Sequence, residues 1–154
     1  MAIQTWRIEI PPEECAALLD GAAPGRLGVI VAGRPEIFPV NHVYDASTGT
    51  IVFPTNERTK WRAALDWPWV AFEVDGMDAD RIGGWSVAVV GRAEELTDSA
   101  EIARLAQRRA VPWGGGRGPS THWLRIVPSK ITGWRIAGAP SDRTTTERLP
   151  APSG

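Results

Sequence analysis

Hydroxyl and cationic side chains gather in one short stretch of the chain, directly after an apolar segment. The residues with this chemistry are Thr55, Arg58, Thr59 and Lys60. They lie at the start of Thr59–Leu65, a segment whose composition predicts a helix. The first backbone N–H groups of a helix have no intrahelical partners, and they attract anions. The stretch therefore predicts a phosphate-binding site, although a plain helix cap by Thr59 or Asn56 is the alternative interpretation.

The segment before this cluster predicts a β-hairpin that would hold it in place. Ile37–Tyr44 and Thr50–Thr55 are alternating runs of the kind that half-buried strands show. The polar connection between them, Asp45–Gly49, ends in a glycine, which is typical of a hairpin loop of that length. The second strand therefore delivers Thr55 to the start of the predicted helix.

The remaining turn and helix signals predict a small antiparallel barrel. We expect helices at Pro12–Leu19 and Ser99–Arg109, the second capped by Ser99 or Asp98. The further strands that we expect are Arg26–Val31, Val70–Val74, Trp85–Leu96 and one or two within Trp123–Ile136. Strands outnumber helices and several are joined as hairpins, so the predicted fold class is mainly β, a β-barrel with peripheral helices.

Length and composition predict one globular domain followed by a tail. The chain has 154 residues, of which 43% are hydrophobic and 23% are charged, as in ordinary globular domains. We expect this domain to span residues 1–138. Residues 139–154 are rich in Pro, Ser, Thr and Arg and contain few apolar side chains. Such a segment cannot bury enough surface to offset its ordering entropy, so we expect a flexible C-terminal tail.

Charge and cysteine content argue against several function classes. The net charge of −1 provides no general electrostatic attraction to nucleic acid or to an anionic membrane. No apolar run reaches the length of a membrane span, and the residues after Met1 lack an apolar signal region. We therefore expect a cytoplasmic protein. The single cysteine, Cys15, lies on a predicted helix and is expected to be a packed apolar residue rather than a nucleophile.

Taken in order, the segments resemble the pyridoxamine 5′-phosphate oxidase-like family of FMN-binding split barrels, in particular its small members of actinobacterial type. The resemblance spans Glu13 to Ile136. It rests on the stretches Ile37–Lys60, Trp67–Asp75, Gly84–Leu96 and Trp123–Ile136. It implies an FMN-binding split β-barrel that forms a homodimer with the cofactor at the subunit boundary. The chain has eight tryptophans, more than a compact core needs, and this surplus fits an interface and a ligand pocket.

The resemblance also implies which residues hold the cofactor. In the family, a hydroxyl at the end of the second hairpin strand and a lysine at the next helix start bind the flavin phosphate. The residues here that resemble this set are Thr55 and Lys60, with Arg58 and Thr59 nearby. The flavin ring lies along the preceding strand, which here reads Pro39, Val40, Asn41 and His42. A second ring contact comes from the strand that here carries Trp85 and Ser86.

The chain departs from true pyridoxamine phosphate oxidases, which use an arginine at the start of the ring strand, an Arg-Gln pair on a later strand and an Arg-rich C-terminal segment. It has Ile37 and Phe38, then Trp85 and Ser86, at the first two places, and no Arg-rich segment after Trp134. Oxidation of the vitamin is therefore not expected. We expect a flavin-dependent oxidoreductase acting on an unidentified small molecule, with the cofactor rather than a side chain performing the chemistry. The alternatives are a deazaflavin-dependent reductase on the same barrel and a non-enzymatic carrier of haem, another tetrapyrrole or flavin.

Two further features lie outside this pattern. Gly114–Gly118 lacks the Gly-Lys-Ser/Thr ending of a phosphate loop. It predicts a flexible loop or, alternatively, a lid that brings Trp113 over a ring bound between subunits. His42 and His122 are far apart in the sequence without further ligands nearby, so no metal site is expected. His42 is instead a candidate haem ligand, a hydrogen-bond donor to flavin, or a partly buried strand residue.

Overall fold

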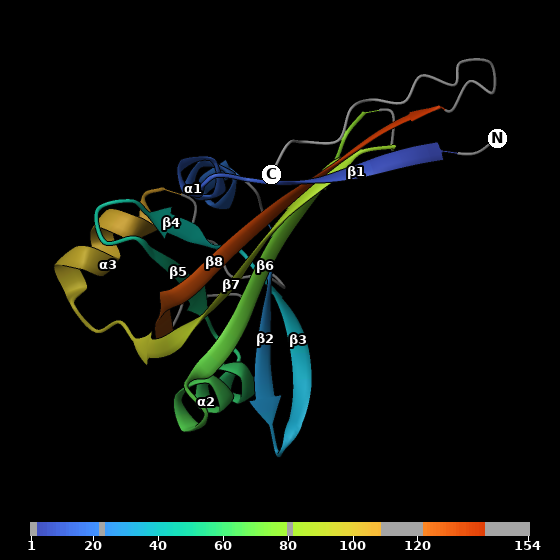
Figure 1. Ribbon diagram of the computed structural model, residues 1–154. Coiled ribbons are helices and arrows are strands. Elements are labelled where there is room, and N and C mark those ends of the chain that lie inside the picture. Colours follow the sequence, from blue (N-terminus) through green and yellow to red (C-terminus); the bar gives the residue numbers. More distant parts are fainter. Residues whose placement is uncertain (1–2, 22–23, 80–81, 109–121, 141–154) are drawn as a thin grey trace.

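The computed structural model describes residues 3–21, 24–79, 82–108 and 122–140 (Figure 1). In these ranges the chain forms eight β-strands and three α-helices. The strands are β1 (Ile3–Glu9), β2 (Gly25–Val31), β3 (Arg34–Val40), β4 (Val43–Asp45), β5 (Thr50–Thr55), β6 (Trp69–Met77), β7 (Gly84–Glu95) and β8 (His122–Pro140). The helices are α1 (Pro12–Gly21), α2 (Arg58–Asp66) and α3 (Ser99–Ala106). The expected mainly β composition is confirmed.

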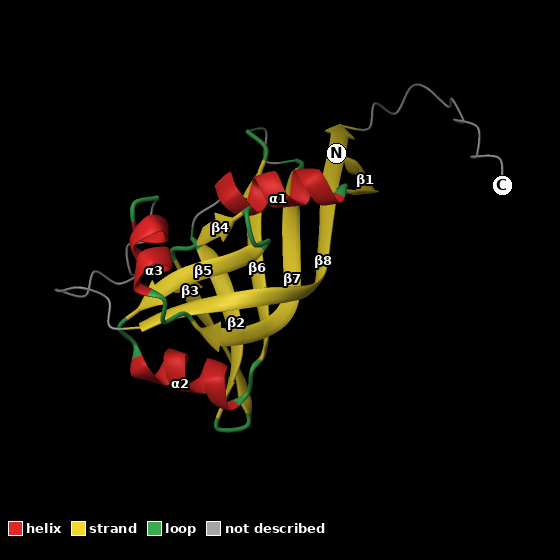
Figure 2. Ribbon diagram, turned by 90° about the vertical axis from the view of Figure 1, so that its left-hand side faces the viewer, coloured by secondary structure: helices red, strands yellow, loops and turns green. Residues whose placement is uncertain are grey.

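All of these strands join one antiparallel sheet that curls into a split barrel. The strand order is β3-β2-β6-β7-β8-β5-β4, and β1 pairs with β8 away from this path. Figure 2 shows α1 lying across one end of the curled sheet and α2 at the opposite end, with α3 beside β5. The predicted barrel with peripheral helices is therefore confirmed, and each helix lies where it can cover an open part of the sheet.

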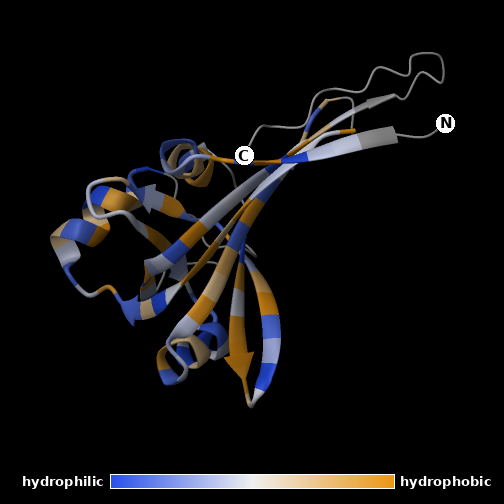
Figure 3. Ribbon diagram, viewed as in Figure 1, coloured by the Kyte–Doolittle hydropathy of each residue, from blue (hydrophilic) through white to orange (hydrophobic). Residues whose placement is uncertain are grey.

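Apolar side chains from alternating strand positions fill the barrel. Every second residue is buried over most of β6 and β7, because successive side chains of a strand point to opposite faces. β5 is buried along its whole length, since one face lines the barrel and the other lies under α3. Phe53 of β5 packs with Phe72 in the main core, whereas Val52 packs with Leu105 of α3. Neighbouring strands also differ in hydropathy: Figure 3 shows β2 as largely hydrophobic and β3 beside it as more hydrophilic.

The predicted strand Ile37–Tyr44 is wrong, because this run is divided between two strands. β3 ends at Val40 and pairs with β2, whereas only the short β4, which begins at Val43, pairs with β5. Between them the His42 ring turns inward, and its Nε2 atom lies 2.6 Å from the Leu19 carbonyl oxygen of α1. The break places β3 and β4 at the two ends of the strand order. The predicted turn is confirmed, with Gly49 at a φ of 67°.

Helix boundaries differ from the predicted ones by one to three residues, with α1 ending at Gly21 and α2 at Asp66. α2 begins at Arg58, and its N-cap residue is Glu57, so the plain cap that the sequence suggested is wrong. For α3 the expected cap is confirmed, because the Asp98 side chain accepts a hydrogen bond from the Glu101 backbone N–H at 2.8 Å. α3 ends at Ala106, earlier than expected.

A long arm extends beyond the barrel. β8 is a single strand of 19 residues, and its last part pairs with β1 on one side and with the start of β7 on the other. Figure 1 shows this part projecting away from the helices. β1 has no counterpart among the predicted strands, because residues 5–9 are exposed and show no buried face. β8 reaches Pro140, two residues into the predicted tail. Trp113, the loop Gly114–Gly118 and residues 141–154 lie outside the described residues.

Candidate functional site

The start of α2 brings the predicted phosphate-binding residues together around a buried lysine. Lys60 is 4% exposed and Thr55 is 2% exposed, although lysine is seldom buried unless it is paired. The Thr55 hydroxyl accepts a hydrogen bond from the Glu57 backbone N–H at 3.0 Å. The Lys60 Nζ atom lies 3.3 Å from the Glu57 carboxylate and 5.2 Å from the centroid of the Phe38 ring. The half-exposed Glu57 carboxylate compensates the buried charge only in part.

The N-terminus of α2 carries no side-chain cap beside this lysine. Glu57 occupies the N-cap position in an extended conformation, and its side chain makes no capping hydrogen bond. The Trp61 N–H donates to the Glu57 carbonyl at 3.1 Å. The N–H groups of residues 58–60 come before this bond and point out of the end of the helix, as at other helix starts. Their partial positive charge adds to that of Lys60, so this end of α2 is suited to a phosphate.

Arg58 lies between two cavities that adjoin the helix start. One, of about 400 Å³, is lined by Asn56, Arg58, Trp61 and His122. The other, of about 470 Å³, lies between α2 and the end of β2 and is lined by Arg58, Thr59, Arg62 and Asp66 together with apolar residues. Among the described residues Arg58 has no ion-pair partner, whereas Arg62 pairs with Asp66 at 3.5 Å. An exposed guanidinium without an ion pair among the described residues therefore faces the space next to the start of α2.

Trp61 and His122 form a ring pair at the wall of the first cavity. Their ring centroids lie 4.1 Å apart and their planes differ by 21°. One carboxylate oxygen of Glu95 holds both rings, at 3.2 Å from the Trp61 indole nitrogen and 3.2 Å from the His122 Nδ1 atom. No local sequence pattern predicts this pair, because α2 and the start of β8 meet only through the barrel topology.

The four residues of the predicted ring strand divide into inward and half-buried positions. The side chains of Val40 and His42 are buried, while Pro39 and Asn41 are half-buried. Since the Leu19 carbonyl can only accept, the close Nε2 atom of His42 carries the proton and donates. That nitrogen therefore has no lone pair to offer a haem iron. Phe38 next to Pro39 contacts Lys60, which places the ring strand beside the phosphate residues.

Trp85 and Ser86 lie apart from the α2 start, on the arm. They are half-buried and line a cavity of about 340 Å³ together with residues of β1, β6 and β8. None of the residues around Lys60 lines that cavity. On β8, Ser86 pairs with Trp134 and Thr55 pairs with His122, so the two positions are separated by roughly 40 Å of extended strand at 3.3 Å per residue. The predicted site residues thus form two groups in one chain.

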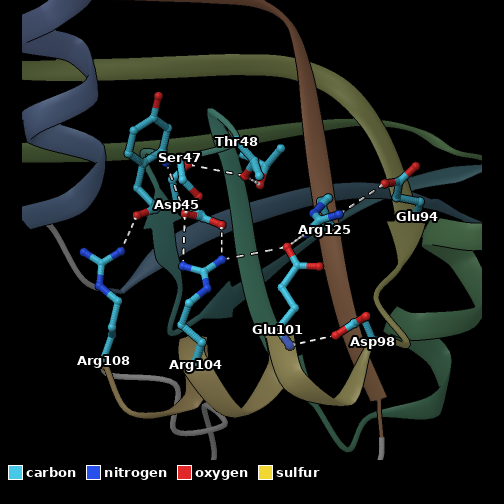
Figure 4. Close-up of polar contacts among 11 residues, drawn as sticks. Asp45, Ser47, Thr48, Glu94, Asp98, Glu101, Arg104, Arg108 and Arg125 are labelled. Carbon is cyan, nitrogen blue, oxygen red and sulfur yellow. Dashed lines mark hydrogen bonds and ion pairs between the residues drawn. The ribbon is translucent and has the colours of Figure 1, made fainter.

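A second cluster of charges surrounds the other end of β5. Asp45 is 2% exposed, and its carboxylate accepts hydrogen bonds from Arg104 of α3 at 2.7 Å and from the Ser47 hydroxyl at 2.7 Å (Figure 4). The Arg104 guanidinium, helped by Ser47, holds the pKa of the Asp45 carboxyl well below its usual range, although burial opposes this shift. Arg125 of β8 pairs with Glu101. The charges in this cluster are compensated, so it joins α3 to the barrel.

A family model described as pyridoxamine 5′-phosphate oxidase matches residues 11–135. The chain belongs to the pyridoxamine 5′-phosphate oxidase-like family. It is similar to the uncharacterized protein Rv0080 of Mycobacterium tuberculosis, with 33% identity over 134 residues, covering 84% of this chain and 85% of that protein. The family resemblance seen in the sequence is therefore confirmed.

Solved structures support the same family and fold. A FAD-binding protein from Mycobacterium smegmatis is 38% identical, with a TM-score of 0.65, covering 82% of this chain and 96% of that one. A FAD-binding protein from Mesorhizobium loti is 22% identical, with a TM-score of 0.72, covering 87% and 99%, and it supports the fold alone. The split barrel of this family member is confirmed, and both of these neighbours are described as FAD-binding proteins.

Other chemistry receives no support from the described part of this family member. Among the described residues no three His, Cys, Asp or Glu side chains are placed to hold a metal ion. No helix in the described ranges is long and apolar enough to cross a membrane. Cys15 is buried, its thiol donates to the Ile10 carbonyl at 3.6 Å, and burial raises the pKa of the thiol. This environment suits a packed residue and disfavours a nucleophilic thiolate.

Proposed function

We propose that this protein binds a flavin nucleotide and acts as a small-molecule oxidoreductase. The observation that carries the proposal is the buried Lys60 beside Thr55 and the uncapped N-terminus of α2, in a member of a flavin-binding family. A buried ammonium with a single, half-exposed carboxylate partner contributes little to fold stability, since burying the charge is costly. It is a good anchor for a phosphate, which brings compensating charge and several hydrogen-bond acceptors.

The residues at this end of α2 fit the phosphate that FMN and FAD share. Lys60 would pair with the phosphate, the N–H groups of residues 58–60 would donate to its oxygens, and the hydroxyls of Thr55 and Thr59 would add further contacts. Arg58 would compensate the remaining charge from the cavity side. The neighbour from Mycobacterium smegmatis that is described as FAD-binding supports a flavin. We propose FMN as the smallest flavin that carries this phosphate.

We further propose that two copies of the chain complete each site. Trp85 and Ser86 line a cavity on the arm that does not include the Lys60 group, so one flavin cannot meet both groups within a compact single-chain pocket. The arm also exposes large apolar side chains, among them Trp6, Ile8, Met77 and Ile136. An exposed apolar surface of this kind is typical of a subunit interface. In the homodimer, one subunit holds the phosphate and the partner's arm lies against the ring.

The flavin, when bound, supplies the electron and hydride transfer, as cofactors do in such enzymes. The residues of the chain position it. Phe38 contacts Lys60, and the half-buried Pro39 and Asn41 follow it in the chain, so we assign them to the edge of the ring. The small Ser86 beside Trp85 leaves room for a substrate against one face of the ring.

Binding titrations with FMN, FAD, riboflavin, the deazaflavin cofactor and haemin test the proposal. We expect the phosphate-bearing flavins to bind at least about tenfold more tightly than riboflavin, because a charge-assisted contact contributes roughly 1.5–3 kcal/mol. If deazaflavin or haemin binds tightly and neither FMN nor FAD binds, that compound rather than flavin is the cofactor. The flavin-loaded protein should then oxidise NADH or NADPH over many turnovers with an added electron acceptor. A stable flavin complex that undergoes no turnover with either donor identifies a carrier instead.

A further inference from the structure

We infer that the cavity beside the Trp61–His122 ring pair is a subsite for the adenosine monophosphate half of a dinucleotide flavin. The inference rests on the proposed function, since it extends the phosphate site at the start of α2. It assigns a role to the cavity lined by Asn56, Arg58, Trp61 and His122, which the phosphate residues alone do not use.

The cavity adjoins the start of α2, since Asn56 and Arg58, on either side of the N-cap residue, are in its wall. Thr55 and His122 are direct cross-strand partners in β5 and β8. Directly paired residues of antiparallel strands project their side chains to the same side. The His122 ring therefore stands on the face of the Thr55 hydroxyl, and Asn56 follows Thr55 into the cavity wall. A ligand anchored at Thr55 and Lys60 can reach this cavity without crossing the sheet.

The ring pair offers a rigid surface on which a purine can stack. Glu95 fixes the two rings through one carboxylate oxygen, at 3.2 Å from a nitrogen of each ring. His122 and Glu95 are only about one-third exposed, and Trp61 is half-buried. Because the rings are already held in place, little entropy is lost in ordering them when a nucleobase stacks on this surface. Stacking of this kind accepts any base.

Charge at the cavity mouth favours a second phosphate. Arg58 is exposed and has no ion-pair partner among the described residues. The acidic groups nearby are already engaged, Glu57 by Lys60 at 3.3 Å and Glu95 by the ring pair. FMN carries its negative charge on one phosphate group, whereas a dinucleotide flavin spreads a similar charge over two groups. With the first phosphate at Lys60 and the helix start, the second would lie within reach of Arg58 at the cavity mouth. The volume of about 400 Å³ lies in the range of ordinary ligand pockets.

The cavity on the other side of Arg58 is the less suitable of the two. It contains Trp67 but no ring pair, and its Asp66 carboxylate, paired with Arg62 at 3.5 Å, faces the same space. Trp67 is 60% exposed at the end of α2, without a carboxylate that fixes its ring among the described contacts. Trp67, the C-cap residue of α2, therefore provides a matched control for the role of Trp61.

The test compares dissociation constants of FAD and FMN for the full chain, for Trp61→Leu and for Trp67→Leu. We expect wild type to bind FAD more tightly than FMN. We expect Trp61→Leu to weaken FAD binding by roughly 5- to 150-fold, the range for loss of one base stack, and to change FMN binding less than twofold. Trp67→Leu should alter neither. Retained FMN binding shows that Trp61→Leu is folded. If it does not fold, His122→Ala, at the start of β8, replaces it and should also weaken FAD selectively.

The outcomes separate this inference from the proposed function. Equal binding of FMN and FAD by wild type, or equal weakening of both by Trp61→Leu, overturns the subsite and leaves the flavin proposal intact. Binding of neither flavin overturns both. An adenosine half can also come from a separate nucleotide such as NADPH, so the FMN-loaded protein is titrated with NADPH in the same variants. If wild type binds FMN and FAD equally while Trp61→Leu weakens NADPH binding, the ring pair serves the donor nucleotide and the dinucleotide flavin is rejected.

Discussion

The two ends of β5 carry similar residues but use them differently. At its start, Arg104 of α3 pairs with Asp45, and Arg108, just after α3, pairs with Asp20. At its end, Lys60 has only the half-exposed Glu57, and Arg58 has no ion-pair partner among the described residues. Each end has a helix packed beside it. Compensation of charge, more than composition, distinguishes the structural cluster from the proposed binding site.

The physical reason lies in the cost of burial. A buried charge is tolerated when hydrogen bonds and an opposite charge replace its hydration. Asp45 meets this condition through Arg104 and Ser47, and no ligand is needed to complete it. Lys60 meets it only in part, because half of the Glu57 side chain is in solvent. A phosphate at the start of α2 would complete the compensation there.

Removal of Asp45 should have the largest effect, and it should fall on stability. We expect Asp45→Ala to lower the free energy of unfolding by about 3 kcal/mol, since it leaves Arg104 and Ser47 without their acceptor; the value is at the low end for buried pairs because Arg104 is half exposed. Urea unfolding followed by tryptophan fluorescence measures it. The control is Asp66→Ala, whose pair with Arg62 is exposed and should cost less than about 0.5 kcal/mol. Weakened flavin binding in folded Asp45→Ala would contradict the division into two clusters.

Asp45 also determines how the stability of the fold changes with pH. Arg104 holds the pKa of Asp45 in the folded protein below its usual range, so the carboxylate stabilises the fold fully above the unfolded pKa of about 4. This contribution is lost as the pH falls from about 4 towards the lower folded pKa. The stability difference between wild type and Asp45→Ala should therefore be constant from pH 7 to 5 and shrink below pH 4. A difference that stays constant down to pH 2.5 would show that the charge of Asp45 is not responsible.

Much of the fold could be predicted from the sequence because local patterns decide it. The alternation in Val70–Val74 and Trp85–Leu96 and the Asp98 cap before α3 each reflect the environment of their own segment. The division of Ile37–Tyr44 could not be predicted. Its alternation is continuous, and the break depends on the contact between His42 and Leu19, which comes from another part of the chain.

The candidate site shows the same limit more strongly. Thr55 and Lys60 are close in sequence, so their joint position at a helix start could be inferred directly. The Trp61–His122 pair and the Asp45–Arg104 pair join distant segments, and neither residue of either pair carries a local signal for its partner. The family resemblance assigns Trp85 and Ser86 to the flavin ring, and one chain alone does not bring them to Lys60.

Loss of the Lys60 charge should have the next largest effect, on flavin affinity. Lys60→Met keeps the buried stem and removes the ammonium, so stability should change little or increase slightly. The dissociation constant of FMN should rise about 10- to 150-fold, the equivalent of one charge-assisted contact of roughly 1.5–3 kcal/mol. Riboflavin, which lacks the phosphate, is the ligand control and should bind both proteins equally. Equal FMN affinities in wild type and Lys60→Met would show that the phosphate does not bind at this end of β5.

Two arginines four residues apart on α2 permit a sharper comparison. Arg62 is paired with Asp66, whereas Arg58 lacks an ion pair in the described structure. If uncompensated charge marks the binding site, Arg58→Ala should weaken FMN binding about three- to tenfold, as expected for a solvent-exposed phosphate contact of roughly 0.7–1.4 kcal/mol. Arg62→Ala should leave the affinity within a factor of about two. Isothermal titration calorimetry at one ionic strength measures both, and a larger loss in Arg62→Ala would reverse the assignment.

The smallest effect should have the opposite sign. Glu57 pairs with Lys60 at 3.3 Å and lies at the end of α2 where the phosphate would bind, so its carboxylate competes with the phosphate and repels it. Glu57→Gln should tighten FMN binding about two- to fivefold and leave riboflavin binding unchanged. The gain is modest because the Glu57 side chain is 50% exposed and solvent weakens its field. It should shrink further as salt is raised from about 0.05 to 0.5 M, since exposed charges are screened. Weaker FMN binding in Glu57→Gln would instead identify Glu57 as a support that holds Lys60 in position for the phosphate.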